Sequence, residues 1–181
     1  MKLRAAFVVL CALMLALSGV TIAIAQKAGE AAPAKEGVLK AAEVGGKLFP
    51  DKVFFRGQVA GAQERNSGGV RYADGMLVMA ALVDNSGYST GVKEKYQGYL
   101  ISEVSIEIGG QTLKPGAYGF GFIEGNKLVV MDIGANDVFQ VASAKDDAMK
   151  HPVPLQVVAG SAAGTYRLYK GRDYAEFHRA K

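Results

Sequence analysis

The chain has 181 residues, with 21 lysines and arginines against 17 aspartates and glutamates and a net charge of +4. Basic and acidic residues are interspersed, so no basic stripe is present to follow a phosphate backbone, and nucleic-acid binding is not expected. The single cysteine, Cys11, excludes an intramolecular disulfide and a thiolate metal site. A chain of this length can bury enough apolar surface for one hydrophobic core without a covalent cross-link.

The first 25 residues have the pattern of an export signal. Two basic residues near the start precede the apolar stretch Ala5–Leu17, and Ala23–Ala25 is a small-x-small cleavage site. The apolar stretch is short for a bilayer span, so a signal peptide over 1–25 is favoured over an uncleaved membrane anchor. We expect the mature chain to begin near Gln26, to keep no membrane span after cleavage, and to reside in the periplasm or outside the cell.

Two regions of different composition follow the signal. Residues 26–46 are rich in alanine, lysine, glutamate and glycine, which is typical of a flexible arm, although Val38–Val44 is compatible with a short helix. From Leu48 onward, short runs rich in valine, isoleucine, phenylalanine and tyrosine alternate with glycine, asparagine, aspartate and proline. This pattern is typical of strands and turns, so residues 47–181 are expected to form a single β-domain.

Ten short strands are predicted within this β-domain, and the predicted fold class is all-β. An antiparallel β-sandwich or a flattened barrel of about 8–10 short strands suits this number of elements. In one strand, Val104, Ile106 and Ile108 alternate with polar residues, which predicts one buried and one solvent-facing side. The predicted strands are Val53–Val59, Val70–Tyr72, Met76–Val83, Tyr99–Ile108, Ala117–Ile123, Lys127–Ile133, Val138–Ala142, Pro154–Val158, Thr165–Tyr169 and Tyr174–Phe177.

Two glycine-containing turns predict hairpins. Gly109-Gly110 stands between Ile108 and Gln111, and Gly125-Asn126 stands between two apolar strands of matched length. Glycine and asparagine accept the positive φ that tight hairpins require. Both turns therefore indicate antiparallel pairing of the strands that they join.

One enzyme-like motif is present, Gly87-Tyr88-Ser89-Thr90-Gly91, which fits the G-x-S-x-G pattern of a nucleophilic serine. Asp132 or Asp137, followed by His151 or His178, would complete an α/β-hydrolase triad in the usual chain order. Such an enzyme needs a parallel sheet with alternating helices, whereas this chain shows short strands and tight turns. The favoured interpretation of this motif is therefore a solvated loop. The alternative is a catalytic site that contains Ser89, His151 and His178.

No metal and no cofactor are expected. The two histidines do not stand in an H-x-H or H-E-x-x-H spacing, which argues against zinc. Neighbouring carboxylates such as Asp146 and Asp147 are an ordinary feature of a solvated surface, whereas Ca²⁺ takes about six to eight oxygen ligands, usually from one loop.

Tyrosine is frequent in this chain, with 8 residues, and tryptophan is absent. Because tyrosine combines an apolar ring with a polar tip, such residues can line a ligand groove. The predicted ligand-binding residues are Tyr88, Tyr96, Tyr99, Tyr118 and Phe120. The first two of these would line a cavity if the segment 84–98 covers one. Ordinary strand propensity, with the rings facing solvent or closing a sheet edge, is the competing interpretation.

A longer motif runs from Gly109 to Tyr118 and reads G-G-x-x-L-x-P-G-x-Y. It is followed by an apolar strand, by Gly125-Asn126 and by a second strand at Leu128–Ile133. This arrangement resembles an uncharacterised family of exported bacterial β-domains, which are predicted sandwiches without an assigned activity. The resemblance implies a β-sandwich and export, and it transfers no catalytic residue.

Three functions are compatible with these observations. Acid–base catalysis, nucleophilic attack and metal activation each require a set of side chains that the sequence offers only through the Ser89 motif. The preferred hypothesis is therefore a non-catalytic binding module of the cell envelope, which takes a small apolar or glycan-like ligand or an envelope protein. A serine hydrolase is the alternative. A structural or assembly protein, whose edge strands dock a partner chain, is the second alternative.

Overall fold

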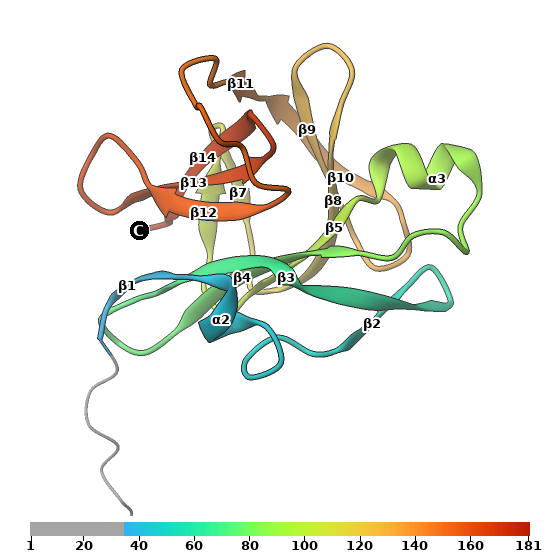
Figure 1. The fold of residues 1–181 in the computed structure, drawn as a ribbon, viewed down its shortest axis with the longest axis horizontal. Helices are drawn as coiled ribbons and strands as arrows, with labels where there is room; N and C mark the ends of the chain where they lie inside the picture. The colour runs from blue at the N-terminus through green and yellow to red at the C-terminus, as the bar shows by residue number, and fades with distance from the viewer. Residues whose placement is uncertain (1–34) are drawn as a thin grey trace, which may run out of the picture. The chain divides into compact units, whose positions relative to one another are not determined.

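The computed structural model describes residues 35–181, which form two antiparallel β-sheets that pack against each other (Figure 1). The predicted all-β, antiparallel sandwich is thereby confirmed. The sheets do not close on themselves, so the flattened barrel that the sequence also allowed is not formed. The signal peptide predicted over 1–25 lies outside the described residues.

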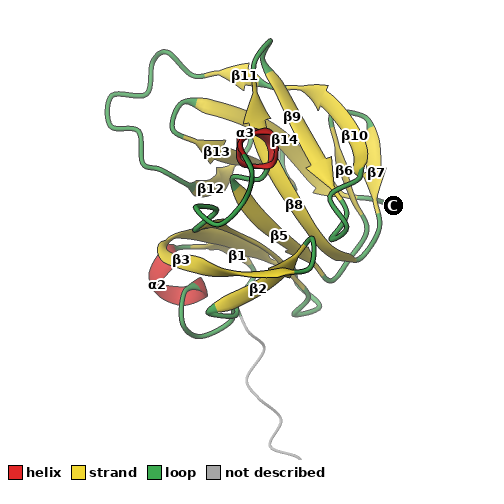
Figure 2. Cartoon of the chain, turned by 90° about the vertical axis from the view of Figure 1, so that its right-hand side faces the viewer, coloured by secondary structure: helices red, strands yellow, loops and turns green. Residues whose placement is uncertain are grey.

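The larger sheet has eight strands. Seven of them follow the spatial order β1, β3, β4, β5, β8, β9 and β10, and β2 pairs with the first residues of β3 (Figure 2). The bounds are β1 Gly37–Leu39, β2 Lys52–Phe55, β3 Gln58–Arg71, β4 Leu77–Val83, β5 Gly98–Ser102, β8 Gly116–Ile123, β9 Lys127–Met131 and β10 Asp137–Ala142.

The smaller sheet has six strands. Its spatial order is β12, β13, β14, β6 and β7, and β11 pairs with β14. The bounds are β6 Ile106–Ile108, β7 Gln111–Leu113, β11 Ala144–Lys145, β12 Gln156–Ala159, β13 Thr165–Lys170 and β14 Asp173–Arg179.

Two short helices, α2 Ala41–Val44 and α3 Thr90–Lys95, pack against β3 and β8 of the larger sheet. Leu39 of β1 and Val44 of α2 are buried in a hydrophobic core. Residues 37–46 therefore belong to the folded domain, and the predicted flexible arm does not extend to residue 46. Within residues 35–181, no helix has the length and hydropathy needed to cross a bilayer.

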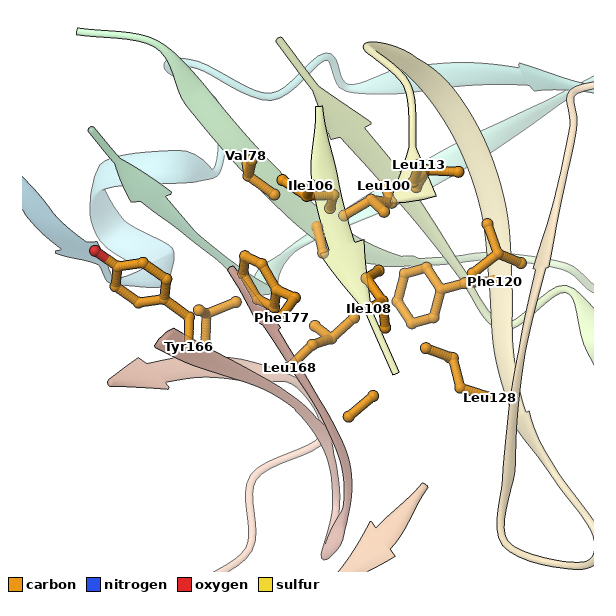
Figure 3. Packing of buried hydrophobic residues seen from close by; sticks show 14 of the residues in the cluster. Val78, Leu100, Ile106, Ile108, Leu113, Phe120, Leu128, Tyr166, Leu168 and Phe177 are labelled. Carbon is orange, nitrogen blue, oxygen red and sulfur yellow. The ribbon is translucent and has the colours of Figure 1, made fainter. Parts of the chain in front are cut away.

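The main core lies between the two sheets. Val78 and Leu100 of the larger sheet meet Ile106, Leu168 and Phe177 of the smaller one, and all five are buried (Figure 3). Each contributes about 25 cal/mol for every Å² of apolar surface that it removes from water. Packing between the sheets is therefore the main source of stability of the domain.

A second core covers the opposite face of the larger sheet. β4 sends Val78 and Ala80 into the main core and Met79 and Ala81 into the second core. Residues of β2, α2, α3 and the adjoining loops complete the second core. Because both faces of β4 are buried, its sequence is continuously apolar rather than alternating.

Both predicted hairpins are confirmed. Gly109 and Gly110 have φ values of 55° and 80° and form the two-residue connection between β6 and β7. Gly125 and Asn126 have φ values of 77° and 52° and connect β8 to β9. These positive φ angles are the local reason why the two turns can be recognised in the sequence.

Several strand boundaries differ from the prediction, and the described residues contain fourteen strands rather than about 8–10. The predicted strand Val53–Val59 is a hairpin, because Arg56 and Gly57 turn the chain with φ values of 48° and 76°. The predicted strand Tyr99–Ile108 divides into β5 and β6, which belong to different sheets. Most of β3 was missed, because residues 63–69 are polar or glycine; residues 63–65 are exposed to solvent, whereas 67–69 are buried.

Candidate functional site

Ser89 lies immediately before α3 and not on the nucleophile turn of a parallel sheet. Residues 84–88 separate it from the end of β4, and β4 pairs antiparallel with both of its neighbours. Its backbone carbonyl accepts the amide hydrogens of Val92 and Lys93, at 3.0 Å each. Ser89 is therefore an exposed residue that begins a short helix.

The two candidate histidines lie on other elements. His151 is exposed in the loop between β11 and β12. His178 lies on β14 of the smaller sheet, where its Nε2 is 3.9 Å from Oε2 of Glu107. The charged neighbour of His178 is thus Glu107 and not an aspartate, and Ser89, His151 and His178 lie on three separate elements. The described structure therefore does not assemble the catalytic triad considered for the hydrolase alternative.

Three of the predicted ligand-binding tyrosines are packed in the second core. Tyr88, Tyr96 and Tyr99 are buried, and Tyr96 stacks on Phe55 with 3.8 Å between the ring centroids. The Tyr88 hydroxyl donates to the Phe55 carbonyl at 2.9 Å. Segment 84–98 is thus fastened to the sheet by its own aromatic side chains, and these rings do not present a ligand surface.

The other two predicted ligand-binding residues lie on the opposite side of the larger sheet. Phe120 is fully buried in the main core. Tyr118 packs against the same core, and its hydroxyl donates to the Lys114 carbonyl at 2.9 Å. The prediction of one concave aromatic patch is therefore wrong, because the rings are divided between the two faces of a sheet and most are taken up by core packing.

A different pocket gathers polar side chains where one end of each sheet meets the other. It has a volume of about 380 Å³, and we call it the Tyr72 pocket. Its walls come from the residue before β1, from the residue after β3, from the loop that leads into β13, and from β13 and β14. The lining residues are Glu36, Tyr72, Ala163, Gly164, Thr165, Tyr166, His178 and Arg179.

Arg179, which lines this pocket, joins the smaller sheet to the turn that follows β3. Its Nη1 lies 2.7 Å from Oδ2 of Asp74, and its guanidinium carbon lies 5.3 Å from the centroid of the Tyr72 ring. The hydrogen bond from Arg179 holds the pKa of the Asp74 carboxyl below its ordinary value. Both side chains are partly exposed, so this ion pair contributes little to stability. Its role is to fix the position of the Arg179 side chain.

Two tyrosines form the aromatic part of the pocket. The rings of Tyr72 and Tyr166 meet edge to face, with 6.0 Å between centroids and an interplanar angle of 82°. Tyr166 also packs on Phe177 of the main core, while its hydroxyl points away from the other labelled core side chains (Figure 3). Burial raises the pKa of Tyr166, and the nearby Glu36 carboxylate adds to this effect.

The hydroxyl of Tyr72 is the most unusual group in the pocket. Tyr72 is 6% exposed, and its hydroxyl is buried without a hydrogen-bond partner. Burial, together with the nearby Tyr166, raises the pKa of Tyr72 to about 12. The phenol is therefore neutral at physiological pH and has an unused hydrogen to donate. Nearly all buried polar groups in folded proteins have a partner, and among residues 35–181 the hydroxyls of Tyr72 and Tyr96 are exceptions.

The Tyr72 pocket was missed in the sequence because its parts are distant along the chain. Tyr72, Tyr166 and Arg179 approach one another only when the ends of β3, β13 and β14 come together. The sequence predicted Tyr72 as the last residue of the strand Val70–Tyr72, and no local pattern marked it as a site residue.

Within residues 35–181, no three histidine, cysteine, aspartate or glutamate side chains are grouped so that they could hold a metal ion. Comparisons with protein-family models, with curated proteins and with solved structures find no match. The Tyr72 pocket is accordingly interpreted from its own geometry and chemistry.

Proposed function

We propose that this chain is an exported, non-catalytic binding module of the cell envelope, and that the Tyr72 pocket holds its small ligand. One observation carries the choice of site: a hydroxyl is buried in the wall of a pocket and has no partner. An unsatisfied buried hydroxyl costs about 1–3 kcal/mol, and departures from good packing and pairing are expected at functional sites. A ligand oxygen that accepts this hydrogen would remove the cost, and this contact requires the Tyr72 side chain to turn toward the pocket, because its hydroxyl is fully covered in this structure.

The charged groups around the pocket favour binding over catalysis, because they are paired with other charged side chains. Arg179 is engaged by Asp74, and His178 lies beside Glu107. General acid–base catalysis needs titratable groups directed at one reacting atom, whereas these groups are directed at each other. Ser89, the serine of the enzyme-like motif, lies next to α3 and does not line the pocket.

Replacing Tyr72 by phenylalanine tests the proposed site. Tyr72→Phe keeps the ring and removes only the hydroxyl, so we expect about five- to tenfold weaker ligand binding with an unchanged or slightly higher free energy of unfolding. Ligand-observed NMR with a library of small polar fragments measures the binding. Tyr96→Phe is the matched control, because the Tyr96 hydroxyl is also buried without a partner but lies in the second core.

Two outcomes would contradict this assignment. Fragments that bind Tyr72→Phe as tightly as the wild type would place the ligand elsewhere on the protein. If no fragment binds the wild type, and its mass by light scattering rises with concentration, the assembly alternative replaces the binding module.

The proposal of export concerns the N-terminal residues and has its own test. When the full chain is expressed in a bacterial host, we expect the protein outside the cytoplasm, with an intact mass that begins at Gln26. Ala25→Phe places a large side chain at the small-x-small site and should leave the leader attached. Wild-type protein that keeps Met1 and stays in the cytoplasm would contradict export, whatever the pocket binds.

A further inference from the structure

A depression beside the turn between β13 and β14 carries an excess of positive charge, and we call it the Lys170 depression. Its charged lining residues are Lys145, Lys170, Arg172 and Asp173, which provide three cations and one carboxylate. Lys145 and Arg172 are exposed, and Lys170 and Asp173 are partly buried. All four side chains can therefore be reached by a ligand from solvent.

The register of the strands directs both lysines to the same side of the smaller sheet. Tyr166 and Leu168 of β13 are buried in the main core, so Lys170, two residues further on, projects from the same face. Asp173 of β14 is the cross-strand partner of Lys170 on one side and of Lys145 on the other. Because residues directly opposite each other share a face, the two lysines flank Asp173 in one row.

The positive charge of this row is not neutralised by ion pairs. None of the ion pairs within residues 35–181 involves a cation of the depression. Asp146, the residue after Lys145, is directed to the opposite face of the sheet, because its carboxylate accepts the hydroxyl of Tyr169, which precedes Lys170 on β13, at 3.1 Å. The excess charge is therefore available to attract an anion.

Hydrogen bonds fix the backbone that carries these cations. The amide of Gly171 donates to the carbonyls of Val153 and Pro154, at 3.2 Å each. Nε of Arg172 donates to the carbonyl of Met149 at 3.2 Å, which holds one edge of the guanidinium in place. Its two Nη groups are further donors that can meet a ligand. The turn and the loop before β12 thus form one hydrogen-bonded framework.

The charge and the donors of the depression match a doubly charged oxyanion. After Asp173 is set against one cation, two positive charges remain, and a phosphate monoester carries about −1.5 to −2 charges at pH 7. Its oxygens accept from lysine ammonium groups and from the donor fork of arginine. Leu82 and Pro152 form part of the wall, and apolar walls strengthen the attraction by focusing the field of the cations.

We propose that the Lys170 depression binds a phosphate group. Lys145 and Lys170 contact its oxygens from the smaller sheet, and Arg172 contacts them from the turn. Asp173 opposes binding and so limits the affinity. This site has no lining residue in common with the Tyr72 pocket, and the proposal does not depend on the binding function proposed above.

Titration of the labelled protein with inorganic phosphate at constant ionic strength tests the proposal, with amide shifts in NMR spectra as the measurement. We expect saturable shifts at Gly171 and Arg172. Lys145→Gln and Lys170→Gln should each weaken binding about fivefold, and Asp173→Asn should strengthen it by about the same factor, because it removes the opposing carboxylate. Lys127→Gln is the matched control, since Lys127 is exposed and does not line the depression.

Three outcomes would overturn the proposal. Shifts that do not saturate would show a general effect of ions. Equal binding by Lys170→Gln and Lys127→Gln would place the phosphate elsewhere. Acetate that binds as tightly as phosphate would show that a doubly charged ligand is not preferred.

Vesicles of phosphatidylcholine, with and without phosphatidic acid, distinguish a lipid headgroup from a soluble phosphate as the source. Co-sedimentation that requires both phosphatidic acid and Lys170 would assign the site to a lipid. Saturable binding of inorganic phosphate without co-sedimentation would assign it to a soluble molecule. Co-sedimentation that is equal in the wild type and Lys170→Gln, without binding of inorganic phosphate, would contradict a phosphate site here.

Discussion

Phe55→Ala is expected to destabilise the domain by about 3–5 kcal/mol, which is a large share of a total of roughly 5–15 kcal/mol. Phe55 is fully buried, stacks on Tyr96 and meets Tyr88 edge to face with 6.2 Å between ring centroids. Removing its ring leaves a cavity in the second core and takes away the support of segment 84–98. Thermal unfolding should show a midpoint lower by roughly 10–20 °C.

The neighbouring residue supplies the control for this experiment. Phe54 is 53% exposed and lies on the same strand with its side chain on the other face. Phe54→Ala should therefore change the free energy of unfolding by only about 0.5 kcal/mol. Hydrogen exchange adds a local measurement, since amides of α3 should lose protection in Phe55→Ala before those of β13 and β14. Equal destabilisation by the two variants would contradict this account of the second core.

Gly121→Val is expected to destabilise the domain by about 2–3 kcal/mol through overpacking. A side chain at Gly121 would collide with the backbone carbonyl of Lys95, the last residue of α3. The amide of Gln97 also bridges this contact, because its Nε2 donates to the Phe122 carbonyl at 3.0 Å and its Oε1 accepts the Phe122 amide hydrogen at 2.9 Å. Chemical denaturation measures the loss.

A glycine in open space is the control for Gly121. Gly61 also lies within a strand, but a Cβ there would meet nothing within 4 Å. Gly61→Val should therefore be neutral or slightly stabilising, because it restricts the unfolded chain and suits a strand. A Gly121→Val variant as stable as the wild type would show that α3 is not pressed against β8.

The alternation of residues along β8 explains why these two predictions concern the same region. Phe120 and Phe122 face the main core, whereas Gly119 and Gly121 face the second core. A side chain at Gly119 would collide with Phe55, so the glycine face of β8 is the surface on which the Phe55 ring and α3 rest. The sequence shows this alternation plainly, but it does not say what lies on the glycine face.

Features that depend on neighbouring residues were predictable. The hairpins at Gly109-Gly110 and Gly125-Asn126 follow from the φ angles that these residues accept, and the buried positions of Ile106 and Ile108 follow from period-two alternation. The all-β class follows from the same local patterns. These inferences succeed because turn conformation and the side from which a side chain projects are set within a few residues.

Features that depend on residues distant in the chain could not be predicted from the sequence. Tyr88, Tyr96 and Tyr99 have the composition of a ligand groove, and only the position of Phe55 determines that they fill a core. The division of Tyr99–Ile108 between two sheets is likewise decided by which strands pair with each half. The tertiary structure alone brings Tyr72 and Arg179 together, because a pocket is formed by the ends of strands whose order in space differs from their order in the sequence.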